Sequence, residues 1–197
     1  HILVMLFFII FQSSLYAANK TWSGATNSNW NTASNWIGNN LPGNGDDILI
    51  PGGITNYPIV TTNVSVKNIT VNTTGSGGKL TVNSGTFNMA RITVNSTGLL
   101  TVSGGTMKPS GITVNGTLLV NGGTVASSGT FAVNAGGVVN QVSGVIHMNS
   151  NTASNPNDHI RIVAGGVFNQ SGGTLAVKDL LPGGGTFNQT GSSAIFK

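Results

Sequence analysis

The chain has 197 residues, of which 39% are hydrophobic and only 6% are charged. Its net charge of +4 comes from eight scattered lysines and arginines against four aspartates, because glutamate is absent. A nucleic-acid-binding protein would gather its basic residues on one face, so this composition excludes that class. Cysteine is also absent, and the fold must therefore rely on its core and its backbone hydrogen bonds.

Residues 1–18 have the pattern of a secretory signal peptide. Residues 1–11 are almost wholly apolar, and a polar stretch then leads to Ala17 and Ala18, which suits cleavage after either alanine. The run is too short to cross a membrane as a helix, and it lacks an initiator Met, so we expect a chain truncated at its front. We predict an exported protein, secreted or at the cell surface, whose mature chain has no membrane span. A buried first strand or helix is the weaker interpretation.

Residues 19–60 differ from the repeats that follow them. All three tryptophans of the chain, Trp22, Trp30 and Trp36, fall within this region. The open end of a stack of strands exposes apolar core and unpaired edges, which must be covered. We interpret the tryptophans as the buried core of an N-terminal cap, since large aromatic side chains tend to be buried. The alternative is an exposed platform for stacking sugar rings.

Two adjacent acids, Asp46 and Asp47, precede an apolar strand at residues 48–50. As catalytic carboxylates they would need a partner acid at a defined separation, and the neighbouring sequence supplies none. We therefore expect them to form a turn and to accept hydrogen bonds from backbone amides. Weak calcium binding through their oxygens is the alternative.

Residues 61–197 repeat two short phrases. The longer phrase reads L-T-V-N-S-G-T at 80–86, L-T-V-S-G-G-T at 100–106 and L-L-V-N-G-G-T at 118–124. The shorter phrase, I-T-V-N, occurs at 69–72, 92–95 and 112–115. Both alternate apolar and polar residues with a period of two, which indicates short strands separated by turns.

The first residue of the longer phrase recurs at a nearly constant spacing. These anchor residues are Leu80, Leu100, Leu118, Val139, Phe168 and Phe187. The intervals between them are 20, 18, 21, 29 and 19 residues, and a period near twenty indicates a repeat architecture. One repeat cannot bury its own apolar side, so each coil must pack on the next. We expect the anchor residues to stack in a single buried file.

This pattern predicts an all-β fold, a right-handed parallel β-helix (β-solenoid) with about 20 residues per coil and an N-terminal Trp-containing cap. An antiparallel sandwich ranks second, because its strands would not repeat the same phrases at a fixed spacing. A left-handed hexapeptide helix is less favoured, since no six-residue rhythm is visible. Disorder would lack the apolar periodicity.

The shorter phrase places polar residues in rows. Thr70, Thr93 and Thr113 should stack outward in one column, which Ala132 interrupts at the fourth coil. The asparagines two positions later, Asn72, Asn95 and Asn115, should lie beside them or at the adjoining corner. Such an outward polar array could recognise ice or a crystalline polysaccharide. The simpler interpretation is that Thr suits strands and Asn suits corners.

Three glutamines, Gln141, Gln170 and Gln189, occupy the place of inward-facing valines in earlier coils. A buried amide is costly unless its hydrogen bonds are satisfied. We predict either a ladder of glutamines that satisfy one another, as in stacked amides, or a bulge that turns them outward.

The interval of 29 residues leaves an insertion at 149–159, and insertions in solenoids become loops that often bind ligands. His147, Asp158, His159 and Arg161 gather here. As metal ligands they match no strong motif, and as a glycosidase or lyase site they lack a second acid. A solvated loop is the default interpretation, with a ligand-binding loop as the alternative.

The entry segment and the coils together resemble the beginning of large secreted bacterial β-helix repeat proteins. The entry segment contains W-S-G, two N-W pairs, L-P-G and D-D-I-L-I-P, and the repeated strand phrases follow it. The resemblance is to adhesin-like surface proteins, similar to autotransporter passengers and filamentous-haemagglutinin-type shafts. It implies export, a right-handed β-helix and an adhesive or scaffolding role, and it carries over no catalytic residue.

These observations predict a non-enzymatic secreted or cell-surface β-helix protein with no cofactor and no metal. Its expected partners are extracellular glycans or host and cell surfaces, and not nucleic acid. We also expect the natural chain to continue beyond the last coil, whose open edge would favour self-association. The alternative is a carbohydrate-active or polysaccharide-binding β-helix of pectate-lyase-like architecture, although fold alone does not confer activity.

Overall fold

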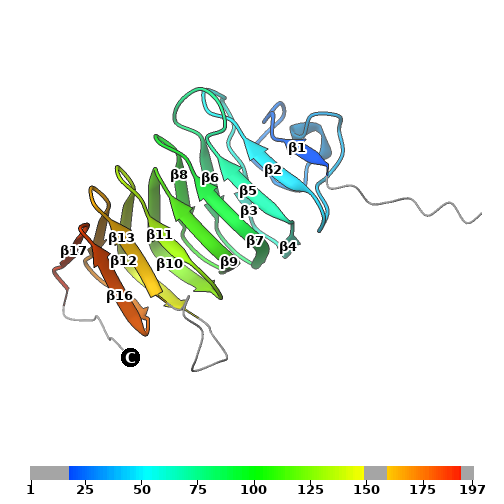
Figure 1. Ribbon diagram of the computed structural model, residues 1–197. Coiled ribbons are helices and arrows are strands. Elements are labelled where there is room, and N and C mark those ends of the chain that lie inside the picture. The colour runs from blue at the N-terminus through cyan, green and yellow to red at the C-terminus, as the bar shows by residue number, and fades with distance from the viewer. Residues whose placement is uncertain (1–17, 149–158, 192–197) are drawn as a thin grey trace, which may run out of the picture.

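The computed structural model describes residues 18–148 and 159–191, which form one elongated stack of β-strands (Figure 1). The stack has about six coils of about 21 residues each. The coils follow one another in chain order, from β1 at one end to β17 at the other. Among the described residues there is no α-helix, and the cap holds one short 3₁₀ turn, η1 (Ala33–Asn35).

Each coil passes through three strand segments, which stack into three faces. Face A contains β2 (Asp47–Ile50), β5 (Asn68–Val71), residues 91–94 of β7 (Thr86–Val94), residues 111–114 of β9 (Thr106–Val114), β11 (Phe131–Val133), β13 (His159–Val163) and β16 (Asp179–Gly183). Face B contains β3 (Ile59–Val60), β6 (Lys79–Val82), β8 (Leu99–Val102), residues 117–120 of β10 (Thr117–Ser127), residues 138–141 of β12 (Val138–Met148), β14 (Val167–Gln170) and β17 (Thr186–Gln189). Face C contains β4 (Val64–Ser65), the remaining segments of β7, β9, β10 and β12, and β15 (Thr174–Ala176).

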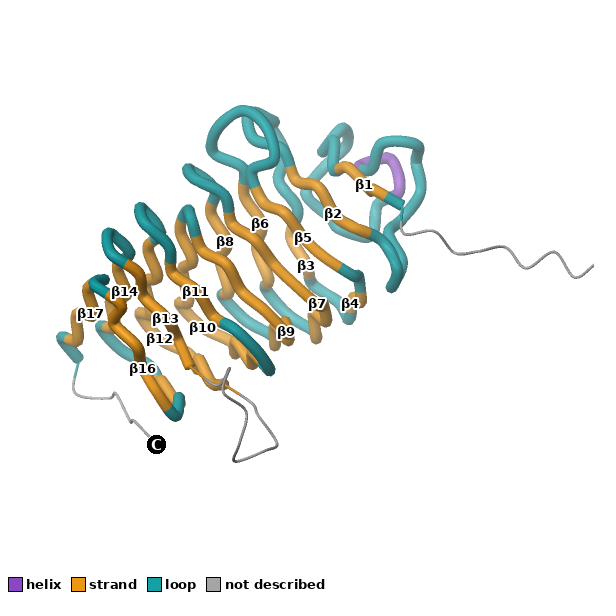
Figure 2. The backbone as a smooth tube through the Cα atoms, viewed as in Figure 1, coloured by secondary structure: helices purple, strands orange, loops and turns teal. Residues whose placement is uncertain are grey.

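Every pairing between strands of successive coils is parallel. Strand β1 (Asn19–Thr21) adds to face A by pairing with β2. The turns lie where one face passes into the next (Figure 2). Parallel pairing between coils rules out the antiparallel sandwich, in which neighbouring strands would run in opposite directions, and it confirms the predicted parallel β-solenoid.

The anchor residues form one file through the core. Leu80 pairs with Leu100 and Leu100 with Leu118, and all three side chains are fully buried. Val139 and Phe168 continue the file and are equally buried. Burying one such side chain contributes about 1.5–3 kcal/mol. The predicted buried stack is therefore confirmed along the inside of face B for five of the six anchor residues. The last, Phe187, pairs in register with Phe168 but is only half-buried.

Glycine shapes the corner between faces B and C. Gly105 and Gly123, which precede the threonine of the repeated phrase, have positive φ angles of 64° and 60°. A Cβ atom at Gly105 would lie 2.5 Å from the carbonyl oxygen of Gly85 in the coil before it, closer than real Cβ contacts allow. The repeated G-T phrase thus reflects a corner that needs both a left-handed backbone and no side chain.

The three tryptophans form the core of the N-terminal cap, as predicted. Trp22, Trp30 and Trp36 are at most 2% exposed, and the Trp30 ring meets Phe87 of face C edge-on at 5.2 Å between centroids. The indole nitrogen of Trp22 donates to the carbonyl oxygen of Asn56 at 2.7 Å. The alternative of an exposed sugar platform is wrong, because these rings are not accessible to a ligand.

A buried asparagine, Asn35, organises the loop around these rings. Its side-chain oxygen accepts hydrogen bonds from the backbone N–H groups of Thr26 and Asn27, at 2.9 and 3.0 Å. Its side-chain nitrogen donates to the carbonyl oxygen of Asn29 at 3.0 Å. A buried amide with these bonds satisfied costs little and fixes the loop in one conformation. Strands β2 and β3 of the same 19–60 segment already belong to faces A and B.

The inward glutamines are buried but do not form a ladder. Gln141 and Gln170 are 0% and 1% exposed, as the inward placement predicts. The side-chain nitrogen of Gln141 donates to the carbonyl oxygen of Thr174 at 2.8 Å, and the Gln170 amide has no hydrogen-bond partner in the described part of the chain. Gln189 is exposed. The predicted mutual satisfaction is wrong because the Gln141 amide turns to the backbone of the corner instead.

An amide ladder does form, one residue earlier and on the outer side. Asn169 donates from its side-chain nitrogen to the side-chain oxygen of Asn140 at 2.9 Å, and Asn188 donates to Asn169 at 2.9 Å. The three residues pair in register along face B. The shorter side chain of asparagine keeps each amide directly over the next, so this row is a hydrogen-bonded column on the outside of the stack.

Shortening an anchor side chain should destabilise the stack strongly. We expect Leu100→Ala to lower the free energy of unfolding by about 2–5 kcal/mol, because a cavity would remain in a tightly stacked file. The matched control is Thr101→Ala, the next residue on the outer side of β8, which should change it by less than about 0.5 kcal/mol. Urea unfolding followed by circular dichroism measures both. Equal losses would contradict the stacked core.

Removing the unpartnered amide of Gln170 should stabilise the protein. We expect Gln170→Met, which keeps the volume of the side chain, to raise the free energy of unfolding by about 1–3 kcal/mol, the usual penalty of a buried unsatisfied polar group. Gln141→Met should gain less, because Gln141 makes a hydrogen bond to Thr174. The same urea titrations test this, and a destabilised Gln170→Met protein would show that the amide is satisfied.

Candidate functional site

The predicted threonine row lies on face A. Thr70 pairs in register with Thr93, and Thr93 with Thr113, and all three are half-buried on the outer side of their strands. Ala132 follows Thr113 in the same row, as predicted. Neighbouring strands are about 4.8 Å apart, so the row offers hydroxyl groups at a regular short spacing. The stacking of these threonines is confirmed, and a ligand for them stays a prediction.

The asparagines of the I-T-V-N phrase lie at the corner between faces A and B, one of the two predicted positions. Asn72 is 7% exposed and has a positive φ angle of 65°. Its side-chain nitrogen donates to the carbonyl oxygen of Ser96 at 2.6 Å, and its side-chain oxygen accepts from the N–H of Gly78 at 3.0 Å. Asn72 therefore holds the corner together and is not part of an outward array.

The two later asparagines also bond between coils. Asn95 donates to the carbonyl oxygen of Asn72 at 3.1 Å, and Asn115 accepts from the side-chain nitrogen of Asn134 at 2.8 Å. Both are half-buried. These amide groups hold one coil to the next. The asparagines therefore do not extend the threonine row into a wider polar array.

The insertion residues fall on two faces. His147 lies on face C, in register with Ala126 and Ala176, whereas His159 and Arg161 lie on β13 in face A. Asp158 and the rest of the insertion, 149–158, lie outside the described residues.

On face A, His159 pairs in register with Asp179, and Arg161 lies exposed between Ala132 and Leu181. Within the described ranges, no group of three or more His, Asp or Glu residues could hold a metal ion. The ligand-binding loop stays a prediction.

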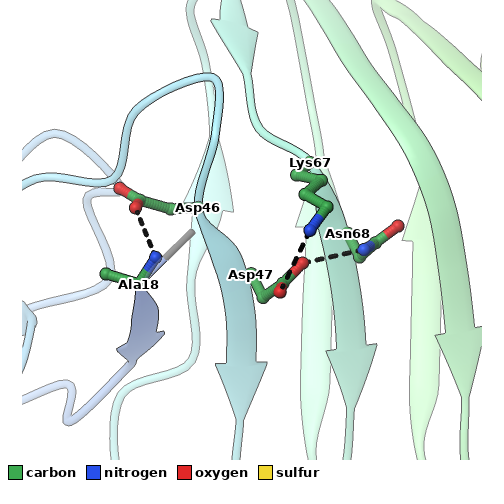
Figure 3. A network of polar contacts seen from close by, with 5 residues as sticks. All are labelled: Ala18, Asp46, Asp47, Lys67 and Asn68. Atoms are coloured by element: carbon green, nitrogen blue, oxygen red, sulfur yellow. Dashed lines mark hydrogen bonds and ion pairs between the residues drawn. The ribbon is translucent and has the colours of Figure 1, made fainter. Parts of the chain in front are cut away.

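Asp46 lies in a turn and accepts from backbone amides, as predicted, whereas the Asp47 carboxylate contacts side chains instead (Figure 3). Asp46 accepts from the N–H of Gly43 at 2.8 Å and from the N–H of Ala18 at 3.3 Å. Asp47, on β2, accepts from the side-chain nitrogen of Asn68 at 2.7 Å, and Lys67 lies 3.8 Å from its other oxygen. Both charged groups of that ion pair are partly exposed, so the pair contributes little, about 0.2–1 kcal/mol.

The structure also shows a shallow hollow that the sequence did not reveal. It has a volume of about 300 Å³ and is lined by Ser28, Asn29, Ile59 and Thr61. The Ile59 side chain is 37% exposed, and the N–H of Ile59 donates to the carbonyl oxygen of Ser28 at 2.8 Å, which ties the cap to face B. Two hydroxyls, an amide and an aliphatic surface can contact a polar ligand with one apolar side.

One comparison with known proteins gives a match. A family model described as a domain of unknown function (DUF8693) matches residues 21–107, which comprise the tryptophan cap and the first coils. No curated protein and no solved structure matches the chain. In the described residues, no helix is long and apolar enough to span a membrane.

Substitutions of Asn72 test how the corner between faces A and B is stabilised. We expect Asn72→Ala to lower the free energy of unfolding by about 2–4 kcal/mol, because it loses side-chain hydrogen bonds worth about 1 kcal/mol each and forces alanine into a left-handed conformation. Asn72→Gly keeps the backbone relaxed and should cost about 1 kcal/mol less. Urea unfolding measures the difference, and equal losses would show that backbone strain contributes nothing.

Proposed function

We propose that this chain is a non-enzymatic module of an exported surface protein, with an adhesin-like or scaffolding role. Its elongated stack would act as a rod, and its outer walls would contact extracellular glycans or cell surfaces. The observation that carries the proposal is the in-register row Thr70–Thr93–Thr113 on face A, together with the asparagine ladder on face B.

The chemistry of these rows supports contact with neutral polyols. Threonine hydroxyls donate and accept hydrogen bonds, as do asparagine amides, and neither carries a charge that salt would screen. Because three successive coils repeat the same outward residue, each row presents the same group three times. Many weak contacts at a fixed spacing produce avidity when the partner is itself a repeating polymer.

The way in which the coils are joined supports a role in spacing or attachment. Parallel ladders join each coil to the next on all three faces, so a pull along the stack is opposed by several strand pairings at every step. The buried anchor file runs without interruption from Leu80 to Phe168. A rod of this kind keeps its length and displays its walls without needing a second domain to support it.

Polysaccharide binding at one defined place is the second candidate. It is favoured by the hollow between the cap and face B, where exposed Ile59 lies beside the side chains of Ser28, Asn29 and Thr61. An aliphatic surface next to hydroxyl and amide groups suits a sugar ring, which has an apolar face and a polar rim. In this candidate the hollow binds one or two sugar units, and the rows play no part.

Arginine substitutions separate the two candidates. Arginine already occurs in the face A row, at Arg161, so Thr93→Arg should fold and should block the row. We expect it to weaken binding to insoluble cellulose, chitin or a glycan array by about fivefold or more, the effect of losing about 1 kcal/mol of hydrogen bonding. Asn88→Arg, at an exposed outer position of face C whose row already holds Lys108, should leave binding unchanged.

A third variant, Ile59→Arg, fills the hollow. If binding falls in Ile59→Arg and persists in Thr93→Arg, the second candidate replaces the first. If all three variants bind the tested glycans as the parent does, both candidates fail for these ligands. Thermal unfolding of each variant confirms that a loss of binding does not arise from a loss of structure.

A further inference from the structure

The first residue that the structure describes, Ala18, is already fixed to the stack (Figure 3). Its backbone nitrogen lies 3.3 Å from a carboxylate oxygen of Asp46. Its carbonyl oxygen accepts a hydrogen bond from the N–H of Asp47 at 3.0 Å. The ladder between β1 and β2 begins at the next residue, where Asn19 pairs with Asp47. Ala18 is therefore held from both sides, just before the first strand.

The Asp46 carboxylate is positioned before it meets Ala18. Its second oxygen accepts from the N–H of Gly43 at 2.8 Å, and the N–H of Asp46 donates to the carbonyl oxygen of Gly43 at 3.0 Å. This pair of bonds closes a tight turn and orients the side chain. Lys67 forms an ion pair with the neighbouring carboxylate, that of Asp47. The Asp46 carboxylate can therefore pair with a cationic group at Ala18.

The sequence allows cleavage after Ala17 or after Ala18, and the structure distinguishes the two. Cleavage after Ala18 would remove the residue that bonds both Asp46 and Asp47. Cleavage between Ala17 and Ala18 would keep both bonds. It would also turn the Ala18 amide nitrogen into an α-ammonium group, which is charged near neutral pH.

We propose that the exported protein begins at Ala18 and that its new α-ammonium group pairs with the Asp46 carboxylate. A signal peptidase hydrolyses the bond between the Ala17 carbonyl carbon and the Ala18 nitrogen. Water supplies the oxygen that leaves Ala17 as a carboxylate, and its protons complete the ammonium group. The inference rests on the export that the proposed function requires, and it does not depend on what the walls bind.

The pair would secure the capped end of the stack. An ammonium donor makes shorter and stronger hydrogen bonds to a carboxylate than a neutral amide does. It would act on β1, the strand that leads directly into the buried Trp22. Processing would thus strengthen the attachment of the cap, which closes the first coil of face A.

Identification of the first residue is the primary test. The full chain, preceded by an initiator Met and a basic start, is expressed in a bacterial host, and the exported protein is analysed by intact mass and N-terminal sequencing. We expect Ala18 as the first residue. An exported protein that begins at Asn19 or elsewhere overturns the inference and leaves the proposed function standing. A chain that is neither exported nor cleaved overturns both.

The ion pair has a separate readout. In the protein that begins at Ala18, Asp46→Asn should lower the melting temperature by about 1–3 °C, the size expected of an exposed ion pair. In a matched protein that keeps residues 16–17 in front of Ala18, the amine lies elsewhere and the same substitution should have a smaller effect. Equal shifts in the two proteins would overturn the pairing. Asp47→Asn, which affects the Lys67 pair, should give the same shift in both backgrounds.

Discussion

The structure depends on one constraint, the register between coils. Strand side chains alternate between the two sides of a sheet, so a slip of one residue would turn Leu80, Leu100 and Leu118 from the core to the solvent. The anchor file therefore sets the alignment of every coil on its neighbour. The same register also aligns the outer rows. Once two anchor residues are paired, the residues next to them in the two coils must pair as well. Thr81 over Thr101 is one example.

This is why so much of the fold could be predicted from the spacing of short phrases. The anchor residues, the tryptophan cap and the place of the insertion all follow from period and burial. The direction of the glutamine amides could not be predicted, because alternation defines the side of the sheet but not the direction of a long side chain. The Gln141 amide reaches the carbonyl oxygen of Thr174, an atom whose position depends on the shape of a corner.

The candidate surfaces also include some features that follow from the repeat and some that do not. The threonine row could be read from the repeat. The contact between Asp47 and Asn68, which are one coil apart, follows from the same period. The corner role of Asn72 depends on a positive φ angle that the sequence only suggests. The hollow could not have been found, because it arises where Asn29 of the cap bridges to Ile59, residues that share no pattern.

The end coils of such a stack are stabilised differently from the middle coils. A middle coil is hydrogen-bonded and packed on both sides, whereas the first coil has a neighbour on one side only. Here that first coil is covered by three buried tryptophans and by an asparagine that satisfies the loop backbone. The Asp46 carboxylate lies at the same end, aimed at Ala18. If the Asp46 carboxylate pairs with an α-ammonium group only after cleavage, the cap gains that ion pair only once the preceding residues have been removed. On this proposal, the same cleavage that creates the new amino terminus also strengthens the attachment of the cap.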